Sequence, residues 1–152
     1  MCDWFRLVGD GEIGALIALW ERAGMVRPWN PPEADIAAIR ANPKSALLVA
    51  GPAERLAASV AVEDGGRRAW VYCHCTDPGV RGAGWGRRAM AAAEDRGRAA
   101  GHTKLQLLAR RSNAPVLSFY DRLGYEESAV VVLHKWLDPV REQAFRGSPD
   151  VH

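Results

Sequence analysis

The stretch Val80-Arg81-Gly82-Ala83-Gly84-Trp85-Gly86-Arg87-Arg88 carries the most information about this chain. Its alternate glycines lie between a strand-like apolar run and a run with helical periodicity, so it predicts a strand, a tight turn and a helix. Glycine lets the main chain approach a ligand closely. The first N–H groups of a helix are unpaired and lie at the positive end of its dipole, which favours an anion. With the flanking arginines, these features predict a pyrophosphate site.

The residues of the turn argue against two common phosphate-binding motifs. A nucleoside-triphosphate loop needs Gly-Lys-Ser/Thr where this chain has Gly86-Arg87-Arg88. The dinucleotide pattern G-x-G-x-x-A fits residues 84–89, but the acidic residue expected ~20 positions later is missing. A strand-to-helix turn that simply needs small residues is the structural alternative.

The residues around the turn predict a mixed α+β domain built on one sheet. Apolar residues at spacings of three and four indicate helices, and alternating or continuous apolar runs between Gly, Pro and Asp indicate strands. Asp10 is expected to cap the first helix. The predicted order is a strand at 2–8, helices at 12–23 and 33–41, strands at 45–50, 56–63 and 69–76, a helix at 86–100, a strand at 104–108, a helix at 113–123, and one or two strands within 125–137. We expect one domain over residues 1–137 and a polar tail over 138–152 that frays.

The composition is that of an ordinary globular protein. The 152 residues carry a net charge of +2, with 25% charged and 48% hydrophobic residues, which argues against disorder and coiled coils. No apolar stretch reaches the ~20 residues of a membrane helix. The first residues lack the pattern of a secretory signal, so we expect a cytoplasmic protein with no membrane partner.

The positive charge is concentrated in one region. Residues 78–112 contain eight basic and two acidic residues, a local charge of +6, which suits an anionic partner. Nucleic acid is a weaker alternative, because recognition aromatics are not interleaved with these basic residues. We therefore expect no nucleic-acid partner.

Two motifs resemble those of a known family. Arg81-x-x-Gly84-x-Gly86 follows Asp77-Pro78 and resembles the R/Q-x-x-G-x-G/A motif of the GNAT acetyltransferases, which bind acetyl-coenzyme A (acetyl-CoA). Downstream, Asn113-Ala-Pro-Val-Leu-Ser-Phe-Tyr-Asp-Arg-Leu-Gly-Tyr125 is similar to the family's N-x-x-A-x-x-F-Y-x-x-L-G-F/Y. The resemblance covers residues 3–137. Leu19-Trp20-Glu21-Arg22, followed by Arg27-Pro28-Trp29-Asn30, is further similar to a small bacterial subgroup of this family.

The resemblance implies a GNAT-like fold that holds acetyl-CoA as cosubstrate. The expected fold is a single mixed, largely antiparallel sheet flanked by about four helices, with a splay between the fourth and fifth strands. Main-chain groups of His74, Cys75 and Thr76 would line the pantetheine and polarise the thioester carbonyl, and Asn113 would steady the pantetheine arm. The pyrophosphate would be held at Arg81, Gly82, Ala83, Gly84, Trp85, Gly86 and Arg87.

The implied reaction is direct attack of a primary amine on the thioester, in a small molecule or a protein. Tyr120 matches the position of the family's general acid, which would protonate the departing thiolate. The alternative for Tyr120 is a core aromatic in an amphipathic helix. Phe119 is expected in the core, because adjacent helical residues are ~100° apart. A non-catalytic acyl-CoA-binding module is the alternative function, and the sequence leaves room for a homodimer.

The acceptor side is defined less sharply. Trp29 is expected as a wall of the cleft, with Glu33 or Asp35 attracting a cationic amine. Trp29 as a plug that packs two helices against the sheet is the alternative. Candidates for the general base are Glu63, His74 and Asp35.

The tripeptide Cys73-His74-Cys75 raises the question of a metal site. On a strand, the two thiols face one way and the imidazole the other, so the three side chains cannot close a tetrahedron. We therefore expect no metal, and two cysteines that act as small apolar residues. With three cysteines in the chain, a disulfide framework is not expected either.

Overall fold

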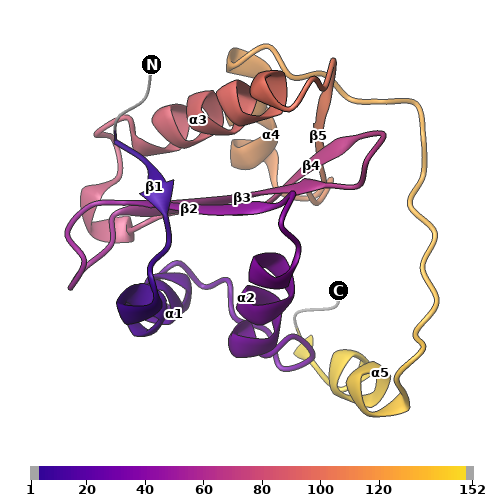
Figure 1. The fold of residues 1–152 in the computed structure, drawn as a ribbon. Helices are drawn as coiled ribbons and strands as arrows, with labels where there is room; N and C mark the ends of the chain where they lie inside the picture. Colours follow the sequence, from indigo (N-terminus) through magenta and orange to yellow (C-terminus); the bar gives the residue numbers. More distant parts are fainter. Residues whose placement is uncertain (1–3, 150–152) are drawn as a thin grey trace. The chain divides into compact units, whose positions relative to one another are not determined.

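A five-stranded sheet in the order β1-β2-β3-β4-β5 carries the fold (Figure 1). The strands of this computed structural model are β1 (Arg6–Leu7), β2 (Ala46–Ala50), β3 (Ala58–Asp64), β4 (Ala69–Thr76) and β5 (Leu105–Leu107). Neighbours are antiparallel from β1 to β4, and β5 joins β4 in parallel. The predicted mixed, largely antiparallel sheet is therefore confirmed.

Five α-helices accompany the sheet, where the sequence predicted about four. They are α1 (Ile13–Arg22), α2 (Pro32–Ala41), α3 (Trp85–Ala99), α4 (Ala114–Arg122) and α5 (Pro139–Arg146), with short 3-10 turns η1 (Asp10–Glu12) and η2 (Pro78–Val80). The helix α3 lies on one face of the sheet, and α1 and α2 lie on the other (Figure 1). None of the helices in the described part of the chain is long and apolar enough to span a bilayer.

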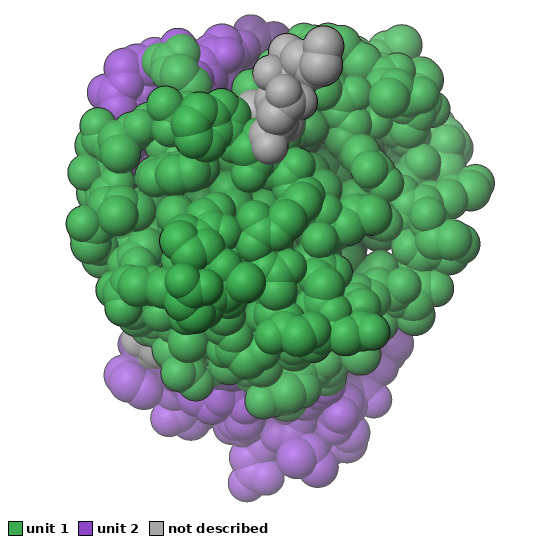
Figure 2. Space-filling view, turned by 60° about the vertical axis from the view of Figure 1, so that its left-hand side comes forward, with its two compact units in different colours: residues 1–26, 31–108 green, residues 27–30, 109–152 purple. Residues whose placement is uncertain are grey.

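The structure describes residues 4–149, which form two units (Figure 2). Unit 1 comprises Met1–Val26 and Pro31–Leu108, and therefore includes the whole sheet with α1, α2 and α3. Unit 2 comprises Arg27–Asn30 and Ala109–His152, with α4 and α5.

The core of unit 1 follows the apolar periodicity of its elements. Leu16, Leu19 and Trp20 of α1 and Ile36 and Ile39 of α2 are buried in one cluster with side chains from β2 and β3. On the other face, α3 buries mainly alanines and one methionine. Small side chains let this helix lie close to the sheet, which sets where its first turn stands relative to the end of β4.

Local details differ from the predictions at the first strand and the first helix. The opening strand is reduced to Arg6–Leu7, and the predicted positions Cys2 and Asp3 lie outside the described residues. The prediction that Asp10 caps the first helix is wrong. A 3-10 turn precedes α1, and Gly9 is the N-cap of that turn. Asp10 forms an ion pair with Arg40 of α2 instead.

The predicted final strands within 125–137 are absent from the described structure, so this prediction is wrong. The segment is extended, but it joins none of the described strand ladders. Its apolar run from Val130 to Leu133 has side chains that are 67% to 89% exposed. A run with strong β propensity becomes a strand only when another strand pairs with its main chain.

The polar tail forms the helix α5, so the prediction that it frays is also wrong. Asp138 caps this helix, because its Oδ1 accepts hydrogen bonds from the N–H groups of Val140 (2.9 Å) and Arg141 (3.3 Å). An ion pair of 2.8 Å between Arg146 and Glu142 adds a contact one turn apart. The domain boundary at residue 137 stays a prediction.

Candidate active site

The glycine-rich turn has the main-chain geometry of an anion site. Gly82 and Gly84 have φ angles of +84° and +85°, and Gly84 is the N-cap of α3. The N–H of Arg88 makes the first intrahelical bond, to the Gly84 carbonyl at 3.1 Å. The amides of Trp85 and Gly86 precede that bond, at the positive end of the helix dipole. The predicted strand, turn and helix are confirmed here.

An aromatic cluster holds the turn from the side of α3. The Arg88 guanidinium lies 4.8 Å from the ring centre of Trp4 and 5.3 Å from that of Trp85, and it donates to the Ala83 carbonyl at 3.3 Å. Arg88 and the Trp85 ring therefore stabilise the turn. The side chains of Arg81 and Arg87 are exposed at its surface, where an anion would approach.

Asp77 fixes the entry to the turn and is only 3% exposed. Its Oδ1 accepts from the Gly79 N–H at 2.9 Å, and its Oδ2 lies 3.2 Å from an Nη2 of both Arg22 and Arg55. The Gly79 hydrogen bond, followed by the two arginine charges, holds the pKa of Asp77 below its ordinary value. The carboxylate thus ties the turn to α1 and to the loop before β3.

We expect Asp77→Asn to lower the free energy of unfolding by about 1–2 kcal/mol at neutral pH, because the amide keeps a hydrogen-bond acceptor but loses both ion pairs. Since the pKa of Asp77 is lowered on folding, its contribution is complete above the ordinary pKa and is lost as pH falls through the lowered one. Urea unfolding at neutral pH and near pH 3 should therefore show a shallower acid loss in the variant. Glu142→Gln, which breaks the exposed pair with Arg146, is the matched control and should change little.

A bulge interrupts β4 in the middle of the Cys73-His74-Cys75 tripeptide. The register passes from Ala61↔Tyr72 to Ser59↔Cys75, and Cys73 has a φ of +53°. Both thiols pack with the apolar cluster on the side of α1 and α2, which confirms the prediction for the cysteines. Burial, the largest cause, raises the pKa of Cys73 to about 12 and that of Cys75 to about 11.

His74 belongs to the opposite side, that of α3. Its Nε2 lies 3.1 Å from the Gly86 carbonyl in the first turn of that helix. Burial lowers the pKa of His74, which keeps the ring neutral near pH 7. Among the described residues, no group of three or more histidine, cysteine or acidic side chains could hold a metal ion.

The predicted splay between the fourth and fifth strands is present. The parallel ladder joins Ala69 to Leu105 and ends at Val71 and Leu107, whereas β4 continues to Thr76. His74, Cys75 and Thr76 lie on this part of β4, beyond the end of β5. The structure therefore brings together three predicted contacts of the thioester arm and, directly after them, the glycine-rich turn.

The candidates for the general base separate into two places. Glu63 at the end of β3 is half-buried, and burial followed by the Asp35 charge raises its pKa. The Asp35 charge also contributes to the raised pKa of Cys73, so both carboxylates lie on the α2 side of the sheet. His74 lies on the α3 side, and Glu33 is exposed on α2.

Tyr120 lies in α4 and Asn113 directly precedes this helix, both in unit 2. Asn113 is the N-cap of α4 and its Oδ1 accepts from the Val116 N–H at 3.4 Å. The Tyr120 ring meets those of Phe119 and Tyr125 edge to face, with centres 5.1 and 5.7 Å apart. Burial raises the pKa of Tyr120 to about 12, so its hydroxyl keeps its proton at neutral pH.

Trp29 is buried, and its described ring contact is with the C-terminal helix α5. Its ring meets that of Phe145 from α5 at 4.9 Å, nearly perpendicular, and Phe145 also lies 5.2 Å from Trp136. All three residues belong to unit 2. The sequence analysis does not predict this cluster, because it expects strands within 125–137, where Trp136 lies, and a frayed tail from 138, where Phe145 lies.

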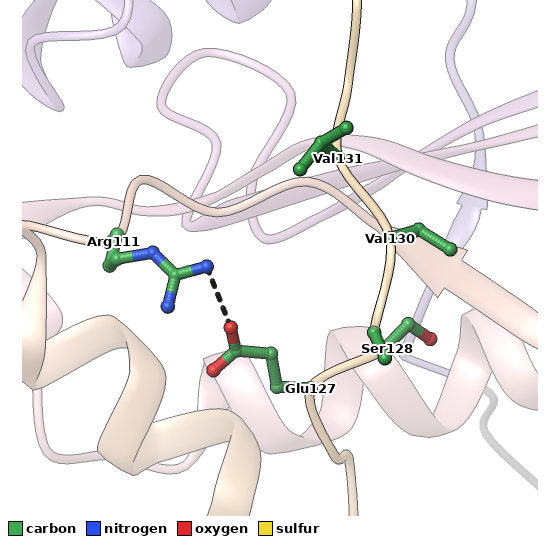
Figure 3. Close-up of a pocket in the computed structure, with 6 residues that line it drawn as sticks. Arg111, Glu127, Ser128, Val130 and Val131 are labelled. Carbon is green, nitrogen blue, oxygen red and sulfur yellow. Dashed lines mark ion pairs between the residues drawn. The ribbon is translucent and has the colours of Figure 1, made fainter.

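A pocket of about 530 Å³ in unit 2 contains none of the predicted site residues (Figure 3). Its lining is Arg111, Glu127, Ser128, Ala129, Val130 and Val131. Figure 3 shows the Arg111 and Glu127 side chains pointing toward each other, with an Nη2–Oε1 distance of 2.8 Å. Both charges are largely exposed and satisfied by each other, so the pocket offers no built binding group.

The fold has counterparts among solved structures. AAC(6')-Iy, solved with the bisubstrate analogue CoA-S-monomethyl-acetylneamine, matches with a TM-score of 0.73 and 16% identity over 87% of this chain and 96% of that one. The ribosomal-protein-S18-alanine N-acetyltransferase of Escherichia coli matches with a TM-score of 0.71 and 22% identity, over 82% of this chain and 78% of that one. At these identities the likeness establishes the fold alone.

Sequence relatives and a family model establish the family. An acetyltransferase of Pectobacterium atrosepticum is 32% identical over 137 residues, which cover 90% of this chain and 97% of that protein. An acetyltransferase of Sodalis glossinidius is 34% identical over 133 residues, which cover 87% of this chain and 94% of that protein. The model of the acetyltransferase (GNAT) family matches residues 15–125. With that match over most of its length and these relatives over nearly all of theirs, the chain belongs to the GNAT family of acetyltransferases.

Proposed function

We propose that this acyltransferase moves an acetyl group from acetyl-CoA to a primary amine by direct attack on the thioester. The observation that carries the proposal is the end of β4, which extends past β5 and runs straight into a main-chain anion site at the start of α3. The amides from Gly82 to Arg87 would hold the pyrophosphate, with the exposed Arg81 and Arg87 adding charge.

The main chain of His74, Cys75 and Thr76 would line the pantetheine and donate to the thioester oxygen as negative charge develops there. Prepositioned main-chain donors are a strong source of transition-state stabilisation. Asn113 would steady the pantetheine arm, and Tyr120 would protonate the departing thiolate. Burial raises the pKa of Tyr120 to about 12, so its hydroxyl carries a proton at neutral pH and can donate it as negative charge develops on the sulfur.

The acceptor amine must lose a proton before it attacks. An alkylamine with a pKa of ~10.4 is only ~0.1% neutral near pH 7, so a base raises the reactive fraction. Glu63 is the best candidate, because burial and the Asp35 charge raise its pKa toward neutrality. Asp35 and the exposed Glu33 would attract a cationic amine, with Trp29 beside them in the chain between α1 and α2.

The test is release of free thiol from acetyl-CoA in the presence of a panel of amines and peptides. We expect release that depends on both the protein and an amine. A melting shift with acetyl-CoA but no amine-dependent release would favour a non-catalytic acyl-CoA-binding module. If acetyl-CoA causes no melting shift and no amine releases free thiol, both functions are contradicted.

We expect Trp29→Ala and Phe145→Ala to raise the Michaelis constant of the acceptor by a similar factor, about threefold to tenfold, which is comparable to the contact energy of an aromatic pair. The two rings pack on each other, so removing either one releases the other. The dissociation constant of acetyl-CoA should not change. Val140→Ala, at a position of α5 that is 76% exposed, is the control. A loss of thermal stability with an unaltered acceptor constant would mean that Trp29 only packs.

A further inference from the structure

Ser59 of β3 is completely buried, and its hydroxyl contacts three different groups. It lies 3.0 Å from the Nε1 of Trp20 in α1, 2.7 Å from the Cys73 carbonyl and 3.4 Å from the Cys75 sulfur. A buried serine with this many partners is more than a small filler of the core. The contacts connect α1, which carries the family-like Trp20, to the middle of β4.

The chemistry of the partners fixes the direction of each hydrogen bond. An indole N–H can only donate and a carbonyl can only accept, so Ser59 accepts from Trp20 and donates to Cys73. Because the single hydroxyl proton is used there, the Cys75 thiol donates to the Ser59 oxygen. The hydroxyl therefore uses its donor and both of its acceptor sites, and the short bond goes to the Cys73 carbonyl.

The Cys73 carbonyl belongs to a residue that lies in the bulge of β4 and has an unfavourable backbone conformation. Ser59 faces Cys75 and Ala61 faces Tyr72, so two residues of β4 stand opposite one residue of β3. The extra residue of such a bulge leaves the ladder. The φ of +53° at Cys73 is a conformation that side chains other than glycine rarely adopt. The Ser59 hydroxyl gives this displaced carbonyl a partner inside the core.

The bulge includes the first of the main-chain groups that would polarise the thioester. His74 is its second residue, and the His74 ring reaches the Gly86 carbonyl at 3.1 Å in the first turn of α3. A shift of the bulge would therefore move both the end of β4 and its connection to the helix start. Errors of about 1 Å in such groups can cost on the order of 10²-fold in rate.

We propose that Ser59, held in place by Trp20, is a positioning residue for acetyl transfer, because it fixes the bulge that aims the main chain of His74, Cys75 and Thr76. This inference rests on the proposed function. It also gives a role to the indole N–H of Trp20, because packing alone would need only an apolar side chain at this position. Ser59 itself touches no substrate; it acts through the β4 main chain.

The experiment compares Ser59→Ala with Trp20→Phe, Ser59→Thr and the control Ile39→Ala. Ser59→Ala removes the donor to Cys73 and should lower kcat about threefold to tenfold, with a smaller effect on the dissociation constant for acetyl-CoA. Trp20→Phe replaces the indole with a smaller aromatic ring that lacks the N–H, and should have a smaller effect on kcat. Ser59→Thr restores the hydroxyl and should recover most of the turnover. Ile39→Ala opens the same apolar cluster from α2 and should lower the melting temperature without changing kcat.

Hydrogen exchange of the amides in residues 72–76 provides a second readout that needs no activity. Exchange should accelerate in Ser59→Ala and not in Ile39→Ala. Unchanged kcat in a folded Ser59→Ala variant, or unchanged exchange at the bulge, would overturn the inference. A wild-type protein that transfers no acetyl group would instead contradict the proposed function, while the exchange data would still decide whether Ser59 fixes the bulge.

Discussion

Gly84→Val should weaken acetyl-CoA binding by well over tenfold, and we expect a loss on the order of 100-fold. Gly84 is the N-cap of α3 at a φ of +85°, which valine adopts only with strain. Relief of that strain rotates the first-turn amides away from the pyrophosphate. Losing one or two hydrogen bonds to a charged group, each worth about 1.5–3 kcal/mol, corresponds to this range.

Gly101→Val is the matched control for backbone strain. Gly101 has a φ of +84° after the other end of α3, and nothing lies within 4 Å of an added Cβ. An added Cβ at Gly84 meets only the Arg88 guanidinium carbon, at 4.0 Å. Both variants therefore carry a similar strain and should lose similar stability, but only Gly84→Val should lose affinity in a calorimetric titration with acetyl-CoA. If both folded variants bind acetyl-CoA with equal affinity, the assignment of the pyrophosphate site to this turn is wrong.

Tyr120→Phe should lower kcat at least tenfold and leave acetyl-CoA affinity almost unchanged. The substitution keeps the ring that packs against Phe119 and Tyr125 and removes only the proton donor. General-acid assistance is commonly worth 10²–10⁴-fold, and the CoA thiol is a fairly good leaving group, so the loss should lie toward the lower end. Because burial raises the pKa of Tyr120 to about 12, the hydroxyl should cause no alkaline loss of kcat below about pH 10.

Tyr125→Phe is the matched control, since it removes a hydroxyl from the neighbouring ring. Steady-state kinetics of the two variants, with a separate measurement of acetyl-CoA affinity, separate the roles. Normal turnover in Tyr120→Phe would leave acetyl transfer standing without this tyrosine. A collapse of both turnover and affinity would mean that the tyrosine supports the core of α4.

The parts of the fold that local chemistry determines could be predicted from the sequence. The periodicity of α1 and α2, the three central strands and the glycine-rich turn agree with the structure, with ends that shift by one or two residues. Each of these elements has its own apolar face or its own glycine. The predictions that failed depended on partners distant in sequence. Asp10 forms an ion pair with Arg40, and the apolar run after Ser128 pairs with no strand in the described ladders.

The candidate site divides in the same way. The main-chain geometry of the turn follows from glycines at alternate positions of one short stretch, so it could be predicted. The Ser59 network could not, because it depends on the register between β3 and β4 and on a bulge at a cysteine. The contact between Trp29 and Phe145 joins residues far apart in sequence. It could not be predicted, because the polar composition of α5 gives no sign of an aromatic contact.

The two buried thiols of β4 bear on whether the acetyl group could first be transferred to the protein. With pKa values of about 12 and 11, Cys73 and Cys75 are ionised to less than about one part in a thousand at neutral pH. The thiolate is the nucleophilic form of cysteine, so neither side chain can take the acetyl group and store it as an acyl-enzyme. An acyl-enzyme intermediate on Cys73 or Cys75 is therefore not expected. This agrees with the proposed direct attack, in which acetyl-CoA and the amine are bound together before the CoA thiolate leaves.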